Sequence, residues 1–172
     1  MGRMTAIRDD SKKLAYILRM ENCLNFDIDY GFTPHQIRRM NLRTNEYYYK
    51  DSYGDGGGDE QLSLGVTCMS RLEGIRTLIP IGKNKDVFVP KKLEKLMVCA
   101  VHEFTQAINR CGHFVHFRVV GIDVYRRVVV RLYDPVSGRC LNDIFLQDKY
   151  NTLFEPYTSK HSSTRGESRD GK

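Results

Sequence analysis

Acidic and aromatic side chains gather at one point of the chain, in the sequence YYYKDSYGDGGGDE that begins at residue 47. Carboxylates are the ligands that hard cations prefer, and four lie close together here: Asp51, Asp55, Asp59 and Glu60. Their spacing differs from that of an EF-hand loop, which favours a solvated loop at Tyr47–Asp59 over a metal site. The tyrosines could stack on bases, as aromatic side chains do in single-strand binders, or contact a protein partner.

The sulfur and imidazole groups do not predict a metal centre. The five cysteines are scattered and include no C-x-x-C pair, which excludes the usual zinc and redox motifs: Cys23, Cys68, Cys99, Cys111 and Cys140. His113 and His116 are three residues apart on a predicted strand, so they point to opposite faces. The sequence therefore predicts reduced thiols, an intracellular location and no metal ligand set.

Composition sets wider limits. The chain has 172 residues, of which 41% are hydrophobic and 28% charged, which is typical of one globular domain. No apolar run approaches the roughly 18 residues of a membrane span, and the start of the chain lacks the apolar core of a signal peptide. We therefore expect a soluble protein without membrane contact. The net charge of +6 permits a polyanionic partner but does not require one.

The elements that must position these side chains begin with strands. Residues 1–13 are predicted to be a polar lead-in. A compact apolar run predicts a strand at Leu14–Met20, and period-two alternation predicts the next at Leu24–Tyr30. Gly31, Thr33 and Pro34 interrupt the pattern, and a third extended segment is predicted at Gln36–Leu42.

The remainder of the chain predicts one long helix among further strands. Residues 62–81 are ambiguous apart from a strand at Arg76–Ile81, and a continuous apolar face predicts the helix at Pro90–Arg110. The elements predicted after this helix are strands at His113–Val120 and Tyr125–Tyr133, turns at Gly121–Asp123 and Asp134–Gly138, and a short helix at Leu141–Lys149 with Asn142 near its N-cap. The polar end, residues 158–172, is predicted to be disordered.

Two blocks of this pattern resemble the staphylococcal-nuclease-like (thermonuclease) family. The first is DIDYGF at Asp27–Phe32, which in that family opens the domain ahead of an arginine-bearing strand. The second is Tyr125-Arg126-Arg127, followed by Asp134…Gly138 and Leu141-Asn142-Asp143. The resemblance covers roughly Leu14–Phe154 and implies an α+β, mainly β fold: an OB-like five-stranded barrel with packed helices. The domain would span 14–157, with an insertion at about 47–89.

The resemblance also implies a chemistry, much of which this chain has lost. The family holds a calcium ion with two aspartates, neutralises the phosphate with two arginines and activates water with a glutamate. By position, Arg38 and Arg127 would be the arginines and Glu46 the base, or the three would form a structural ion-pair cluster. The aspartates align with Asn22 (or Cys23) and Arg43.

An arginine cannot replace a metal-binding aspartate. At an effective dielectric of about 20 and about 4 Å, a carboxylate attracts a divalent ion by roughly 8 kcal/mol, and arginine reverses that sign. We therefore expect no metal site and no cofactor, unless Asp27 and Asp29 rebuild a calcium site.

These expectations lead to competing functions. The first is a catalytically degenerate domain that acts as a binding or scaffolding module. Its partner would be DNA or RNA, or a protein, as in a component of a viral or phage assembly found in the virion. The arginines available for nucleic acid are Arg38, Arg39, Arg43, Arg126 and Arg127. The alternative is an active metal-dependent phosphodiesterase with a rearranged calcium site.

Overall fold

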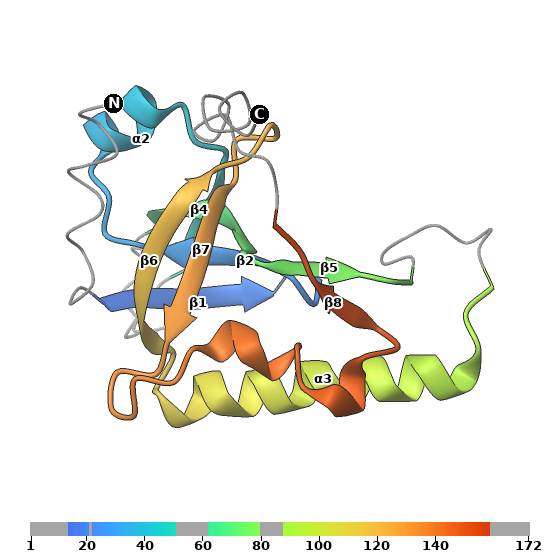
Figure 1. Cartoon of the computed structure of the whole chain (residues 1–172). Helices are drawn as coiled ribbons and strands as arrows, with labels where there is room; N and C mark the ends of the chain where they lie inside the picture. Colours follow the sequence, from blue (N-terminus) through green and yellow to red (C-terminus); the bar gives the residue numbers. More distant parts are fainter. Residues whose placement is uncertain (1–13, 21, 51–61, 80–87, 159–172) are drawn as a thin grey trace, which may run out of the picture.

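The computed structural model describes residues 14–20, 22–50, 62–79 and 88–158. These residues form a closed β-barrel with two α-helices, one lying along the barrel and a short one near its rim (Figure 1). The barrel closes because β2 pairs with β1 on one side and with β4 on the other. Within the described ranges, no helix is both long and apolar enough to cross a bilayer. The predicted lead-in and nearly all of the predicted tail lie outside these ranges.

The connectivity of the barrel is that of an OB fold. Around the ring the strands are β1 (Leu14–Met20), β2 (Asn25–Asp29), β4 (Leu62–Leu72), β7 (Val128–Tyr133) and β6 (Phe114–Ile122), which returns to β1. All neighbours are antiparallel except β4 and β7, which are parallel. Helix α3 (Lys91–Arg110) joins the third barrel strand in chain order to the fourth. The predicted OB-like five-stranded barrel is therefore confirmed.

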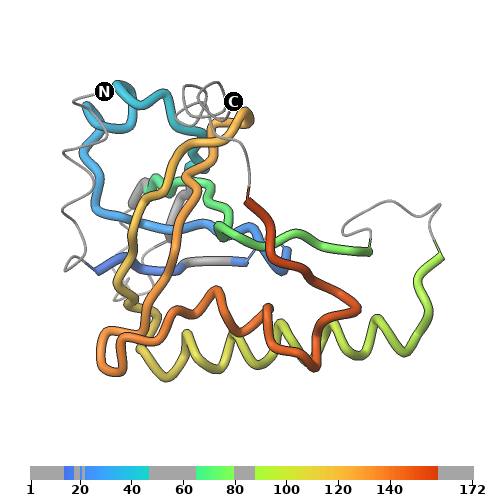
Figure 2. The backbone as a smooth tube through the Cα atoms, viewed as in Figure 1, coloured from blue at the N-terminus to red at the C-terminus, as the bar shows by residue number. Residues whose placement is uncertain are grey.

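Two further pieces of sheet lie outside the closed ring. Strand β3 (Thr44–Lys50) pairs with the first half of β4, and β5 (Ile75–Thr77) pairs with β8 (Phe154–Pro156) in a separate two-stranded sheet. Figure 2 shows the segments of this small sheet beside the barrel, β5 from before α3 in the chain and β8 from near its C-terminal end.

The structure corrects two predictions in this part of the chain. The predicted loop is wrong over Tyr47–Lys50, because these residues pair in register with Gly65–Leu62 and satisfy their backbone groups in a ladder. Residues 51–59 are outside the described ranges. The strand predicted at 76–81 is seen at 75–77. Strands β3 and β4 of the main sheet occupy much of the segment that was predicted to be an insertion. That this segment is inserted relative to the staphylococcal-nuclease-like family stays a prediction.

The segment predicted as a third extended strand is a helix, α2 (Pro34–Met40). Thr33 caps it: its Oγ1 accepts from the Gln36 amide at 3.2 Å, and its own amide donates to Gln36 Oε1 at 2.8 Å. This reciprocal capping box stabilises the first turn, and Asn41 ends the helix in the left-handed conformation. The prediction of an extended segment at Gln36–Leu42 was wrong because these capping signals favour a helix that begins at Pro34.

Strand and helix ends also differ in the C-terminal half. Strand β6 continues to Ile122, and β7 begins only at Val128, because Asp123 Oδ1 accepts from the amides of Tyr125 and Arg127 and holds them in a turn. The predicted helix at 141–149 is two separate 3-10 turns, η1 (Leu141–Ile144) and η2 (Asp148–Tyr150). The strand predicted at 113–120 and the helix at 90–110 are confirmed, with ends shifted by one or two residues.

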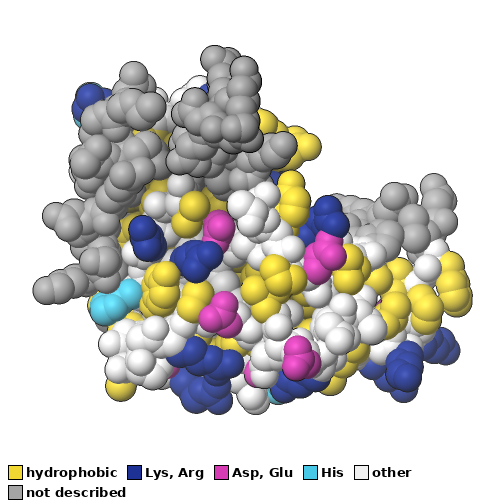
Figure 3. Space-filling view, in the orientation of Figure 1, with side chains coloured by type: hydrophobic (Ala, Val, Ile, Leu, Met, Phe, Trp, Pro, Cys, Tyr) yellow, Lys and Arg dark blue, Asp and Glu magenta, His cyan; other side chains and the backbone are white. Residues whose placement is uncertain are grey.

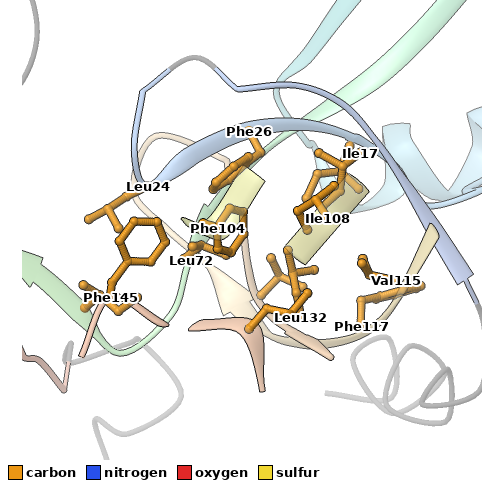
Figure 4. Packing of buried hydrophobic residues seen from close by; sticks show 14 of the residues in the cluster. Ile17, Leu24, Phe26, Leu72, Phe104, Ile108, Val115, Phe117, Leu132 and Phe145 are labelled. Carbon is orange, nitrogen blue, oxygen red and sulfur yellow. The ribbon is translucent and has the colours of Figure 1, made fainter. Parts of the chain in front are cut away.

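The core fills the barrel and the interface with α3. Alternate residues of β6 point inward, and the helix buries Ala100, Phe104, Ala107 and Ile108 against the barrel. Figure 4 shows Phe104 between Phe26 of β2 and Phe145, and the ring centroids of both pairs are 5.1 Å apart. This packing fixes α3 to the barrel.

Candidate functional site

A recess of about 810 Å³ lies where β4 runs into β5 and meets the β6–β7 turn. In OB folds the second and third strands and the loop between the fourth and fifth strands commonly form the ligand surface. The recess lies at these places, since β4 is the third barrel strand and Asp123–Arg127 is the turn before the fifth. Its charged and aromatic lining residues are Arg71, Glu73, Arg76, Asp123, Tyr125, Arg127 and Tyr157.

Arg71 is the arginine of the recess that pairs with no carboxylate among the described residues. It is partly buried near the end of β4, opposite Val129 of β7, and its Nη2 donates to the Ile75 carbonyl at 3.3 Å. No carboxylate in the described part of the chain forms an ion pair with it. Burial raises the pKa of the neighbouring Cys23 thiol to about 12, so no thiolate neutralises this guanidinium near neutral pH.

The second arginine, Arg127, is held by the turn that carries it. Its Nε donates to Asp123 Oδ2 at 2.7 Å, while Oδ1 of the same carboxylate accepts the backbone amide of Arg127. The guanidinium lies over the Tyr125 ring, 5.2 Å from its centroid. The three side chains form a fixed unit at the rim of the recess, with Tyr125 65% exposed.

The other charges in the recess are paired. Arg76 forms an ion pair with Glu155 and lies over the Tyr157 ring at 5.4 Å from the centroid. Glu73 accepts from Arg131 Nε at 2.6 Å, and this bond raises the pKa of the arginine. Figure 3 shows Lys and Arg side chains intermixed with Asp and Glu on this face rather than in one block.

The three residues that the resemblance assigned to catalysis lie on three different elements. Arg38 is exposed on α2, Glu46 is exposed on β3, and Arg127 is in the β6–β7 turn. The assignment placed Arg38 on the barrel strand that follows β2. In the observed structure Arg38 is on α2, and the barrel strand that follows β2 in the chain is β4.

The other arginines predicted to contact nucleic acid do come together. Arg38 and Arg39 are in the last turn of α2, and Arg43 follows it. The Arg43 amide donates to the Arg126 carbonyl at 2.8 Å, which joins this segment to the β6–β7 turn. All four side chains are exposed.

The two aspartates considered for a rebuilt calcium site both have protein partners. Asp27 is fully buried and accepts from Asn45 Nδ2 at 2.7 Å, and Asp29 accepts from the Gly31 amide at 2.8 Å. Asn22, which aligns with one family aspartate, accepts from the amides of Leu24 and Asn25. Over the described ranges, no group of three or more His, Cys, Asp or Glu side chains is arranged to hold a metal ion.

Sequence reasoning missed Arg71, Arg76 and Tyr157. Residues 62–81 contain both arginines, but their apolar residues fit neither a helical nor a strand period clearly. The alternation of larger apolar residues with small or polar ones over Leu62–Cys68, and then Glu73-Gly74, was the available signal for a strand and a turn. Tyr157 carries no such signal, since only β5–β8 pairing brings it to the recess.

Comparison with known proteins does not add a family. No protein-family model matches the chain, and neither curated proteins nor solved structures give a match. The geometry of the barrel and the recess is therefore what the function must be argued from.

Proposed function

We propose that this protein is a binding module for single-stranded nucleic acid that holds a backbone phosphate in the recess beside Arg71 and Arg127. The observation that carries the proposal is the partly buried Arg71 guanidinium, which has no carboxylate partner in the described part of the chain. A partly buried cation of this kind favours an anionic ligand, because the ligand would supply the missing counter-charge.

The neighbouring groups support a nucleotide over a simple anion. Tyr125 and Tyr157 give the recess two aromatic side chains, and bases stack on such side chains with little sequence preference. Asp123 orients Arg127 at the rim, so this guanidinium needs little reordering to approach a phosphate. The resemblance to the staphylococcal-nuclease family supports the same ligand class, since two arginines face the phosphate there.

Binding without hydrolysis is the function that we favour. Glu73 and Asp123, the carboxylates of the recess, are each engaged by an arginine, so neither is presented as a base or a metal ligand. The site as a whole can hold and orient a phosphodiester. We therefore expect binding to be unchanged when divalent cations are removed by a chelator.

The experiment is a titration of labelled oligothymidylate by fluorescence anisotropy between 50 and 200 mM salt, with and without chelator. Loss of one charge-assisted contact costs about 1.5–3 kcal/mol, so Arg71→Ala should weaken binding roughly ten- to hundredfold. It should also flatten the slope of log affinity against log salt by about 0.7. Arg71→Lys should restore part of the affinity, and Arg139→Ala, an exposed arginine in the turn at the other end of β7, is the matched control.

Three results would overturn the proposal. Weak binding that salt hardly changes would exclude phosphate contacts and direct attention to a protein partner. Equal affinities for wild type and Arg71→Ala would exclude the recess as the site. Metal-dependent cleavage that Arg71→Ala abolishes would establish the phosphodiesterase alternative instead.

A further inference from the structure

A second cationic surface lies outside the recess, on α2 and the β6–β7 turn. We define the arginine face by its four members, Arg38, Arg39, Arg43 and Arg126. Residues 31–43, which contain the first three, include no Asp or Glu. The last turn of α2 suits two cations, since the helix dipole is negative at its C-terminal end.

Backbone contacts hold the two halves of the arginine face together. The Arg43 amide donates to the Arg126 carbonyl at 2.8 Å, and the Met69 amide donates to the Arg43 carbonyl at 3.0 Å. Strand β4 therefore anchors the segment that follows α2 beside the β6–β7 turn. Figure 2 shows this segment passing the tip of that turn.

The charges of the arginine face are not compensated within the described structure. In those ranges, its four side chains form no ion pair, whereas Arg76, Arg127 and Arg131 each pair with a carboxylate. Exposed arginines without partners create a positive potential that draws a polyanion and can contact its phosphates.

The arginine face and the recess share one border. Arg126 belongs to the face, while Tyr125 and Arg127, its neighbours in the same turn, line the recess. A strand with one phosphate beside Arg71 would cross this turn, pass the exposed Tyr125 ring and reach α2.

We infer that the arginine face extends the phosphate site into a track, so that the ligand is a single strand of several nucleotides rather than a mononucleotide. This inference rests on the proposed function. Sites on OB folds span roughly 4–16 nucleotides. A flexible single strand can turn from the recess onto the face and stack a base on Tyr125, which a stiff duplex cannot do.

The test compares labelled oligothymidylates of two and twelve nucleotides. The variants are the double Arg38→Ala/Arg39→Ala, Arg43→Ala and Arg126→Asn, with Arg139→Ala as the control. Asparagine is chosen at 126 because that residue has a φ of 65°, which asparagine tolerates better than alanine. Circular dichroism and melting confirm that each variant is folded.

If the arginine face forms such a track, the twelve-nucleotide oligomer should bind at least tenfold more tightly than the dinucleotide. Each single substitution should weaken binding of the twelve-nucleotide oligomer about three- to tenfold and flatten its slope of log affinity against log salt by about 0.7. Binding of the dinucleotide should stay unchanged. The double variant should show about twice the change in slope.

Equal affinity for both lengths, or unchanged salt slopes in all the variants, would overturn the track. If Arg71→Ala still weakens binding of the dinucleotide, the recess remains supported as a phosphate site and only the track is excluded. If the face variants weaken the twelve-mer and Arg71→Ala has no effect, the track stands and the proposed recess fails.

Discussion

At the scale of single residues, buried polar side chains stabilise this fold by hydrogen bonding to the backbone of other segments. Asn142 is the clearest case, since its side-chain amide links η1 to β7 and to the turn that follows β4. Its Oδ1 accepts from the Leu132 amide at 3.1 Å, and its Nδ2 donates to the carbonyls of Glu73 at 3.0 Å and Val130 at 3.2 Å. The predicted role as an N-cap is wrong, because the side chain turns into the protein and satisfies backbone groups next to the recess.

Asn142→Ala should lower the free energy of unfolding by about 2–4 kcal/mol. The change leaves up to three backbone groups without a partner, at about 1–3 kcal/mol for each buried one, partly relieved by water. Urea denaturation followed by circular dichroism measures this. Asn109→Ala on the exposed side of α3 is the control and should change the value by less than about 0.5 kcal/mol. A loss below about 1 kcal/mol for Asn142→Ala would contradict the assigned role.

At the scale of elements, a polar cluster ties α3 to η2. Glu103 on α3 accepts from Lys149 Nζ at 2.8 Å, from the Tyr150 hydroxyl at 2.8 Å and from Gln147 Nε2 at 2.8 Å. The hydrogen bond from Lys149 is the largest cause that lowers the pKa of Glu103 to about 2, with smaller contributions from the other two donors and an opposing effect of desolvation. The cluster fixes the segment that leads to β8 and so to one wall of the recess.

This lowered pKa predicts a pH dependence of stability. The ordinary pKa is 4.5, so the cluster contributes fully above about pH 4.5 and its contribution is lost as the pH falls toward 2. Glu103→Gln should therefore destabilise the protein by about 1–2 kcal/mol at pH 7, a modest value because Lys149 is half exposed. The difference from wild type should shrink below pH 4.5.

Urea denaturation at a series of pH values from 7 to 2 checks this dependence. Glu94→Gln, at the exposed start of the same helix, is the control. If the difference between wild type and Glu103→Gln is the same at pH 7 and pH 2.5, the cluster does not titrate as described.

At the scale of the whole molecule, one aromatic chain couples the barrel, the long helix and the C-terminal segment. Phe104 is fully buried between Phe26 and Phe145, and Phe145 packs edge-on against Phe154 of β8 with ring centroids 5.1 Å apart. This row of aromatic side chains therefore extends from the inside of the barrel to the small sheet beside the recess. Disturbing it should affect both stability and the binding site.

Phe104→Ala should cost about 3–5 kcal/mol, the range for removing a buried phenylalanine from a packed core. Small domains have only about 5–15 kcal/mol in total, so the variant should melt at a much lower temperature. Differential scanning calorimetry measures this. Phe88→Ala, at an 88% exposed phenylalanine, should leave the melting temperature nearly unchanged. Similar melting temperatures for both variants would mean that the core does not depend on this contact.

The sequence by itself determined the elements whose signals are local. The apolar face of α3, the alternation in β2 and β6 and the turn at Asp134–Gly138 all follow from neighbouring residues, and with the two family-like blocks they led to the five-stranded barrel. The resemblance also singled out Arg126 and Arg127 as candidate nucleic-acid contacts. Arg38 and Arg39 were placed on an extended segment, which the structure shows to be the helix α2.

Only the tertiary structure decided which side chains share a site. Arg71, Arg76 and Tyr157 meet the β6–β7 turn because β4 pairs in parallel with β7, and β5 pairs with β8 across a long stretch of chain. The contact of Asn142 with Glu73 was hidden for the same reason. Strand register and pairing across distant segments depend on the packing of the whole core, which no local pattern encodes, whereas helix faces and turns depend on residues only a few positions apart.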